Sequence, residues 1–288
     1  MQSLVPEPIE ILSGVEDGEA ARHFRFRFCG QSDSNLKKWQ STRPGQFFML
    51  SVPGAGEAPF TFTTLPNAQG EFSALVRRMG QVTGALFERK PGYTLGARGP
   101  FGHGWPVTDG DTEKVLTEKA LIVGGGCGLA PLVSLVEHLI NSGTPPVALV
   151  YGARTAAAQV LNPERKRWQS QLPLFDIVQQ GNGCQYRGTP LDLLPEVLNQ
   201  VGEPERVFLC GPEIMMHTVA EFFVQRGLPA SAIWMSIERR MHCATGTCGH
   251  CYLEHQYVCK DGPTYRWDKL APLLARSSGA GALADFHC

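Results

Sequence analysis

Residues 120–131 read ALIVGGGCGLAP and join a short apolar run to a glycine-rich turn and the start of a helical pattern. The run Ala120–Val123 is typical of a strand buried on both faces. Free N–H groups and the dipole at the start of the following helix favour a bound anion, and a proline suits the first helical turn. The alternative is a tight turn that needs glycine for steric reasons. We predict a pyrophosphate site formed by Gly124, Gly125, Gly126, Gly128 and Pro131.

The region from Ala120 to Ile237 alternates short apolar runs with longer helical segments, which predicts a doubly wound parallel sheet of the α/β class. The predicted strands are Ala120–Val123, Val147–Tyr151, Leu174–Val178, Val207–Cys210 and Ala232–Ile237, and the predicted helices are Leu129–Asn141 and Glu213–Gln225.

Ligands of such sheets bind at the carboxyl ends of the strands, so the residues that follow two further strands are candidates. They are Tyr151, Arg154, Cys210, Gly211 and Pro212. Arg154 is either the partner of a nucleotide 2′-phosphate or a solvated loop charge, and both NAD and NADP remain open. Taken alone, Cys210 is more typical of a core thiol.

The first hundred residues have the pattern of β-structure. Phe24, Phe26 and Phe28 alternate with arginines, which is the period of a strand with one buried face. Similar runs at Gln46–Val52 and Glu71–Arg77 are separated by Pro/Gly loops and predict a small antiparallel β-barrel. We expect a barrel over residues 1–112, a nucleotide domain over 113–237 and a small tail module over 238–288, with the polar stretch Thr108–Lys119 as the linker.

Four cysteines near the C-terminus, Cys243, Cys248, Cys251 and Cys259, have the spacing C-x4-C-x2-C-x7-C. The first three match plant-type 2Fe-2S ferredoxins, and glycines between them allow a loop to wrap round a cluster. Structural zinc sites also accept four cysteines, but they usually contain two C-x2-C pairs and this tail has one. We predict a 2Fe-2S cluster on these thiolates and assign the neighbouring histidines to the surface.

Composition limits the partners and the compartment. The chain has 288 residues, 18% of them charged, and a formal net charge of -1, so no global field favours nucleic acid or an anionic bilayer. No stretch approaches the roughly 20 apolar residues of a membrane helix, and the N-terminus lacks a secretory pattern. The clustering of the cysteines indicates metal ligation in a reducing compartment, so we expect a cytoplasmic protein without membrane insertion.

Together these motifs resemble the ferredoxin-NADP reductase superfamily along nearly the whole chain. Its R-x-Y-[ST] flavin motif is matched by Ala58, Pro59, Phe60 and Thr61, its phosphate turn by Gly80, Gln81, Val82 and Thr83, and its GPFG turn by Gly99–Gly102.

The resemblance implies a flavin-binding barrel, with FAD between NAD(P) and the cluster. Thr61 then faces flavin N5, Phe60 lies against the ring, and Cys210 lies near the nicotinamide. Ala58 replaces the usual arginine, so Arg77 or Arg78 is the candidate substitute at the flavin phosphates. The flavin-contacting residues implied in this way are Ala58, Pro59, Phe60, Thr61, Val76, Arg77, Gly80, Val82 and Thr83.

Within the superfamily the cysteine tail is similar to that of the gamma subunits of cytoplasmic nickel-iron hydrogenases. It is also similar to the B subunit of anaerobic sulfite reductase and to the dihydroorotate dehydrogenase electron-transfer subunit. The resemblance implies a diaphorase subunit that works with an iron-sulfur subunit and with the small and large hydrogenase subunits. The alternatives are the same role in either of the other two complexes, or a non-catalytic interaction module stabilised by zinc.

Overall fold

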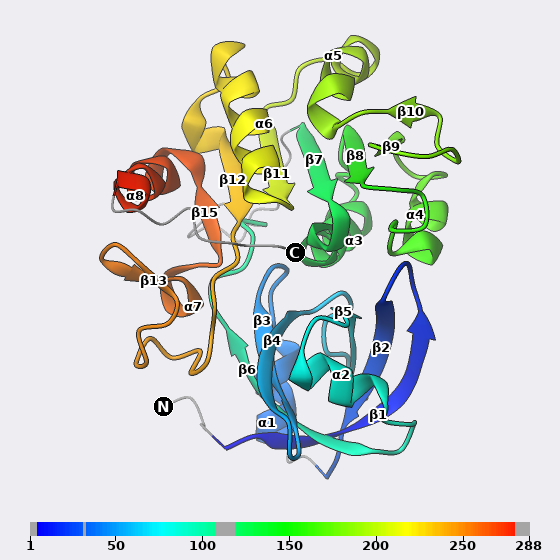
Figure 1. Ribbon diagram of the computed structural model, residues 1–288, viewed down its shortest axis with the longest axis vertical. Helices are drawn as coiled ribbons and strands as arrows, with labels where there is room; N and C mark the ends of the chain where they lie inside the picture. The colour runs from blue at the N-terminus through cyan, green and yellow to red at the C-terminus, as the bar shows by residue number, and fades with distance from the viewer. Residues whose placement is uncertain (1–4, 31–32, 108–118, 280–288) are drawn as a thin grey trace.

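The computed structural model describes residues 5–30, 33–107 and 119–279. A β-barrel, an α/β domain and a C-terminal tail lie against one another, with the tail beside the junction of the first two (Figure 1). Of the predicted linker only Lys119 belongs to the described residues, and residues 280–288 lie outside them.

The barrel is a six-stranded antiparallel sheet in the order β4-β3-β6-β1-β2-β5. Its strands are β1 (Glu7–Glu16), β2 (Ala21–Phe28), β3 (Phe47–Val52), β4 (Gly56–Thr61), β5 (Glu71–Arg77) and β6 (Thr94–Phe101), with helices α1 (Asp33–Gln40) and α2 (Gln81–Phe87). Hydrogen bonds of Thr63 and Thr64 with Ser73 link the two outer strands, and this closes the sheet. The three predicted barrel strands are confirmed as β2, β3 and β5.

Phenylalanines fill the barrel. The Phe48 ring lies 4.7 Å from that of Phe62 and 5.2 Å from that of Phe72, measured between centroids. Burial of each such side chain contributes roughly 1.5–3 kcal/mol. Phe24, Phe26 and Phe28 of β2 are buried in the same way and add to the stability of the barrel.

The second sheet has seven strands in the order β10-β9-β8-β7-β11-β12-β15. All are parallel except β15, which runs antiparallel to β12. The strands are β7 (Ala120–Gly125), β8 (Ala148–Ala153), β9 (Leu174–Val178), β10 (Tyr186–Arg187), β11 (Arg206–Cys210), β12 (Ile233–Ser236) and β15 (Thr264–Arg266). All five predicted strands are therefore present, within a residue or two of the expected bounds.

Helices cover both faces of this sheet, as expected for a doubly wound fold. The 3-10 turn η2 (Gly126–Leu129) leads into α3 (Ala130–Asn141), which lies with α4 (Asn162–Trp168) on one face. The other face carries α5 (Pro190–Val201), α6 (Glu213–Gln225) and α8 (Trp267–Gly279), with the short η3 (Ala230–Ala232) before β12.

The tail leaves β12, forms the hairpin β13 (Tyr252–Leu253) and β14 (Gln256–Tyr257) and the short helix α7 (Val258–Asp261), and returns as β15 and α8. Its last strand thus extends the sheet of the nucleotide domain. Its apolar residues share one core with Phe47, Met49 and Phe101 of the barrel. The tail therefore packs against both the nucleotide domain and the barrel, and these two contacts fix the position of its cysteines.

Candidate functional site

The glycine-rich turn and the loop after β11 lie in direct backbone contact. A Cβ atom added to Gly128 would stand 2.6 Å from both Cα and N of Gly211. Only glycine allows that approach, so the sequence brings Gly124–Gly128 and Gly211–Pro212 to one edge of the sheet. Both segments belong to the predicted nucleotide site.

Two predicted side chains at this edge point into the protein. The Tyr151 side chain is fully buried, its hydroxyl accepts a hydrogen bond from the Val160 N–H at 3.1 Å, and the Arg165 guanidinium stacks on its ring. Burial raises the pKa of Tyr151 far above its usual range. Tyr151 as a whole is shielded from solvent, whereas Arg154 is exposed.

The Cys210 thiol is 2% exposed and donates to the Ser236 carbonyl at 3.6 Å. Met215 was not anticipated here, although its side chain covers the edge: a Cβ on Gly125 would meet its sulfur at 2.8 Å, and one on Gly211 its methyl carbon at 2.8 Å. The sequence feature that could have indicated this contact is the apolar run Ile214–Met216 in the first turn of the helix after Cys-Gly-Pro.

The strand β4 presents the predicted flavin contacts as a half-exposed strip, Ala58, Pro59, Phe60 and Thr61. Thr61 pairs with Phe47 of β3, and its hydroxyl donates to the Gln46 carbonyl at 3.3 Å. A partly exposed aromatic next to a hydroxyl fits a flat amphipathic ring such as flavin. Val76 is fully buried inside the barrel, so the structure does not expose this predicted contact to a ligand.

The predicted phosphate turn begins α2. The Thr83 hydroxyl accepts from the N–H groups of Met79 and Gly80 at 2.9 and 3.0 Å, which orders the turn. No atom would lie within 4 Å of a Cβ on Gly80, so the turn is open to a ligand. Val82 is half-buried beside it.

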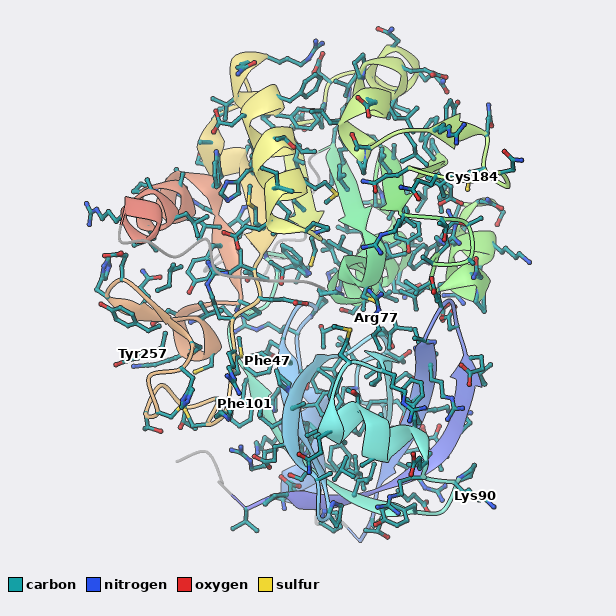
Figure 2. The ribbon with its side chains drawn as sticks, viewed as in Figure 1. Phe47, Arg77, Lys90, Phe101, Cys184 and Tyr257 are labelled. Atoms are coloured by element: carbon teal, nitrogen blue, oxygen red, sulfur yellow. The ribbon has the colours of Figure 1, made fainter. Side chains whose placement is uncertain are left out.

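Arg77 ends β5 at the junction of barrel and nucleotide domain (Figure 2). It contacts the Cys127 thiol of the glycine-rich turn. Burial raises the pKa of Cys127 despite this guanidinium, so the thiol stays protonated near neutral pH. Arg77 therefore lies between the two predicted cofactor sites.

The sulfur atoms of the tail accept hydrogen bonds from backbone N–H groups, the environment that iron-sulfur ligands require. Thr245 and Thr247 donate to Cys243 Sγ at 3.4 Å each, and Gly246 donates to Cys259 Sγ at 3.2 Å. Gly246 has a φ of +74°, which turns its N–H toward the sulfur. This chemistry fits a cluster on Cys243, Cys248, Cys251 and Cys259.

The four thiols differ in environment. Burial opposes ionisation of Cys243, but hydrogen bonds from Thr247 and Thr245 outweigh it and lower its pKa to about 5. Burial and the neighbouring Cys251 raise the pKa of Cys259 to about 12. Cys251 and Cys259 are buried while Cys248 is exposed, so the loop has an inner and an outer side.

The barrel contacts the cysteine loop directly. The Phe47 and Phe101 rings lie 5.8 Å apart where the barrel meets the tail (Figure 2), in the same apolar core as Cys251 and Cys259. The His103 N–H donates to the Gly262 carbonyl at 2.5 Å, and the Thr264 hydroxyl to the Gly104 carbonyl at 2.8 Å. Thr61, the predicted partner of flavin N5, pairs with Phe47, and Phe47 belongs to the apolar core that contains the predicted cluster ligands Cys251 and Cys259.

An ion pair between a buried arginine and a half-buried glutamate at this contact was missed. Arg98 of β6 binds Glu57 of β4 and also the backbone of Cys243. The available signal was one arginine inside the otherwise uncharged strand Thr94–Phe101, since a buried charge needs a partner.

Two family models match the chain. The iron-sulfur cluster binding domain of dihydroorotate dehydrogenase B matches residues 238–271, and the oxidoreductase NAD-binding domain matches residues 122–221. In the described ranges of the chain, no helix has the length and apolar character to cross a membrane.

Curated relatives cover most of the chain. A probable dihydroorotate dehydrogenase B electron transfer subunit from Methanocaldococcus jannaschii is 35% identical over 79% of this chain and 80% of its own. One from Methanopyrus kandleri is 30% identical over 94% of each. The sulfhydrogenase 1 subunit gamma of Pyrococcus furiosus is 28% identical over 90% of each.

A solved NADH-dependent reduced ferredoxin-NADP oxidoreductase, studied for flavin-based electron bifurcation, superposes with a TM-score of 0.73 and 25% identity, covering 96% of this chain and 95% of that one. These comparisons confirm the predicted fold class and the predicted role in electron transfer between NAD(P)(H) and iron-sulfur. The chain belongs to the ferredoxin-NADP reductase superfamily, in the family of electron transfer subunits that carry an iron-sulfur module of the dihydroorotate dehydrogenase B type.

Proposed function

We propose that this chain exchanges hydride with NAD(P) at the edge formed by Gly124–Gly128 and Cys210–Pro212, and passes single electrons outward at the cysteine loop. Bound FAD supplies the conversion, because a flavin takes up a hydride and gives up electrons singly, which a cluster can accept. Thr61 would offer its hydroxyl to flavin N5 and Phe60 an aromatic surface to the flavin ring. Cys210, whose thiol is buried against the Ser236 carbonyl, would lie beneath the nicotinamide site. The alignment of these groups is the main task of the protein.

One observation carries the proposal. Thr61 is the strand partner of Phe47, and Phe47 packs in the core that contains Cys251 and Cys259. Strand β3 therefore links the proposed flavin strand to the apolar core that also contains Cys251 and Cys259. The exposed Cys248 lies on the outer side of the loop, where the acceptor of a partner subunit can approach.

The test uses the full chain purified anaerobically with its cofactors. Addition of NADH or NADPH should bleach the flavin and produce the EPR signal of a reduced 2Fe-2S cluster. Cys251→Ser should retain the bleaching and lose the signal, whereas Cys184→Ser, in the nucleotide domain and outside both sites, should retain both. Protein that holds iron but takes up no flavin, even on reconstitution, would contradict the proposal, and a colourless zinc protein would support the interaction-module alternative.

For the partner we propose a cytoplasmic nickel-iron hydrogenase with its iron-sulfur, small and large subunits. The support is the similarity to two sulfhydrogenase gamma subunits of Pyrococcus furiosus, which covers 90% and 83% of this chain. Copurification with a nickel-containing subunit and hydrogen-dependent reduction of NAD(P) would support this assignment.

A dihydroorotate dehydrogenase complex is the second candidate, because the relatives that share 30–35% identity carry that name. Copurification with a flavoprotein that oxidises dihydroorotate would favour it. The chemistry within this chain is the same in both cases.

A further inference from the structure

Arg98 connects two parts of the molecule through one buried guanidinium. Arg98 is only 5% exposed to solvent. Nε donates to Glu57 Oε1 at 3.1 Å and Nη2 to Glu57 Oε2 at 2.6 Å, while Nη1 donates to the Cys243 carbonyl at 3.2 Å. The fork geometry of arginine allows all three bonds at once.

The two ends of this bridge belong to the two predicted redox sites. Glu57 lies on β4, four residues before Thr61, and its strand partner Ser51 donates a hydroxyl to the same carboxylate. Cys243 is the first of the four cluster ligands. The ion pair therefore links the flavin strand to the entry of the cysteine loop, while His103 and Thr264 hold the exit.

Stability alone is a weak reason for such a pair. Removing the buried Arg98 guanidinium from water costs several kcal/mol, and the attraction that it gains is partly screened because the Glu57 side chain is 28% exposed. Burial raises the cost of ionising Glu57, but the bonds from Arg98 and Ser51 outweigh it and lower its pKa. The pair is thus charged at neutral pH, with its cationic end against the peptide of a cluster ligand.

We propose that Arg98, oriented by Glu57, is a positioning residue that fixes the cysteine loop on the flavin strand and raises the reduction potential of the cluster. This inference rests on the proposed function, since it assumes a cluster on Cys243. The added electron of a reduced cluster is stabilised by a nearby positive charge and by hydrogen bonds to the ligand backbone. The guanidinium is the nearer member of the pair to that backbone.

This role predicts opposite effects from the two ends of the pair. Arg98→Met removes the cation and leaves the carboxylate, so reduction of the cluster becomes harder. Glu57→Gln leaves the cation without its counter-ion, so reduction becomes easier. A pair that only stabilises the barrel would loosen the loop in either variant and move the potential in one common direction.

The experiment is an EPR-monitored redox titration of the full chain with its cofactors, with the flavin potential as the internal reference. At the wild-type midpoint we expect the ratio of reduced to oxidised cluster to fall at least tenfold in Arg98→Met, which is 59 mV for one electron, and to rise in Glu57→Gln. Arg165→Met is the matched control. Arg165 is equally buried and paired with Asp176 in the nucleotide domain, so the cluster potential should stay at the wild-type value.

If Arg98→Met fails to retain iron, the cluster potentials of Arg98→Lys and Glu57→Gln test the inference instead. Lysine keeps the charge but lacks the fork, so we expect a smaller fall in potential and faster loss of iron to a chelator. Shifts of Arg98 and Glu57 variants in the same direction, or potentials equal to wild type, overturn the inference. Absence of iron or flavin in the wild-type chain would instead overturn the proposed function.

Discussion

Substitution of Thr61 tests the proposed hydride transfer to the flavin most directly. Among the residues that the structure describes, its hydroxyl bonds only the Gln46 carbonyl, at 3.3 Å, and can turn to a ligand on the half-exposed strip of β4. We expect Thr61→Val to slow flavin reduction by NAD(P)H about tenfold, the equivalent of one hydrogen bond of about 1.4 kcal/mol. Stopped-flow absorbance measures this rate.

Thr61→Ser keeps the hydroxyl and should react at nearly the wild-type rate. Equal rates for the valine and wild-type proteins would exclude a role of this hydroxyl at flavin N5. Flavin content, measured in the same samples, separates a rate effect from loss of the cofactor.

Glu57 should give the protein a specific sensitivity to acid. Its pKa is lowered from the ordinary value of 4.5, so its stabilising contribution is complete above that pH and is lost as the pH falls through the lowered value. We expect the urea midpoint of wild type to drop below about pH 4.5, and that of Glu57→Gln to drop less steeply. Asp192 and Asp268 also have lowered pKa values and contribute equally to both proteins. Parallel curves would contradict the assignment.

Motif spacing predicted those site residues that lie close together along the chain. The cysteine pattern and the glycine-rich turn lie where the sequence places them, and their backbone contacts fit the predicted ligands. Arg98 and Glu57 could not be paired in advance, because their contact depends on the register of separate strands. The inward orientation of Tyr151 was equally inaccessible, since both faces of a parallel strand are apolar.

At the scale of elements, the contact between the turn η2 and the loop after β11 should control nucleotide binding. A Cβ at Gly128 would lie 2.6–2.7 Å from backbone atoms of Cys210 and Gly211, which cannot move aside as a flexible side chain can. We expect Gly128→Ala to destabilise the protein by about 1–3 kcal/mol and to weaken NAD(P)H binding at least about tenfold. Fluorescence titration and thermal unfolding measure the two effects.

Gly143 provides the matched control. It follows α3, and no atom would lie within 4 Å of an added Cβ, although its φ of +75° makes alanine strained. Gly143→Ala should therefore cost stability and leave nucleotide affinity unchanged. Normal affinity in Gly128→Ala would show that the two loops need not touch for binding.

Not every helix with an apolar period was predicted. Helix α6 has the predicted bounds. Helix α4 reads NPERKRW and has no clear apolar period. Helix α5 buries Leu194, Val197 and Leu198 at helical spacing and was missed, although Pro195 inside it is a residue that normally breaks a helix. The three-residue strand β15 was also missed, because its place beside β12 depends on the path of the whole tail.

At the scale of the whole molecule, the segment from Gly102 to Trp105 contacts all three parts. It continues β6 of the barrel, and its His103 bonds Gly262 of the tail. The Trp105 indole N–H donates to the Pro131 carbonyl at 2.8 Å, at the start of the helix that follows the glycine-rich turn, and its ring packs edge-on against Phe208. The barrel is joined to the nucleotide domain a second time by Asp17, which accepts from the Leu161 N–H at 3.0 Å.

Trp105 should therefore set the alignment of the nucleotide domain on the barrel, and hydride transfer depends steeply on alignment. We expect Trp105→Phe to lose about 1 kcal/mol of stability with the hydrogen bond and to slow flavin reduction by NAD(P)H several-fold. Trp168→Phe is the control, because its indole bonds Glu137 within the nucleotide domain at 2.7 Å. It should lose similar stability without slowing the reaction. Equal slowing in both variants would mean that stability, rather than the junction made by Trp105, governs the rate.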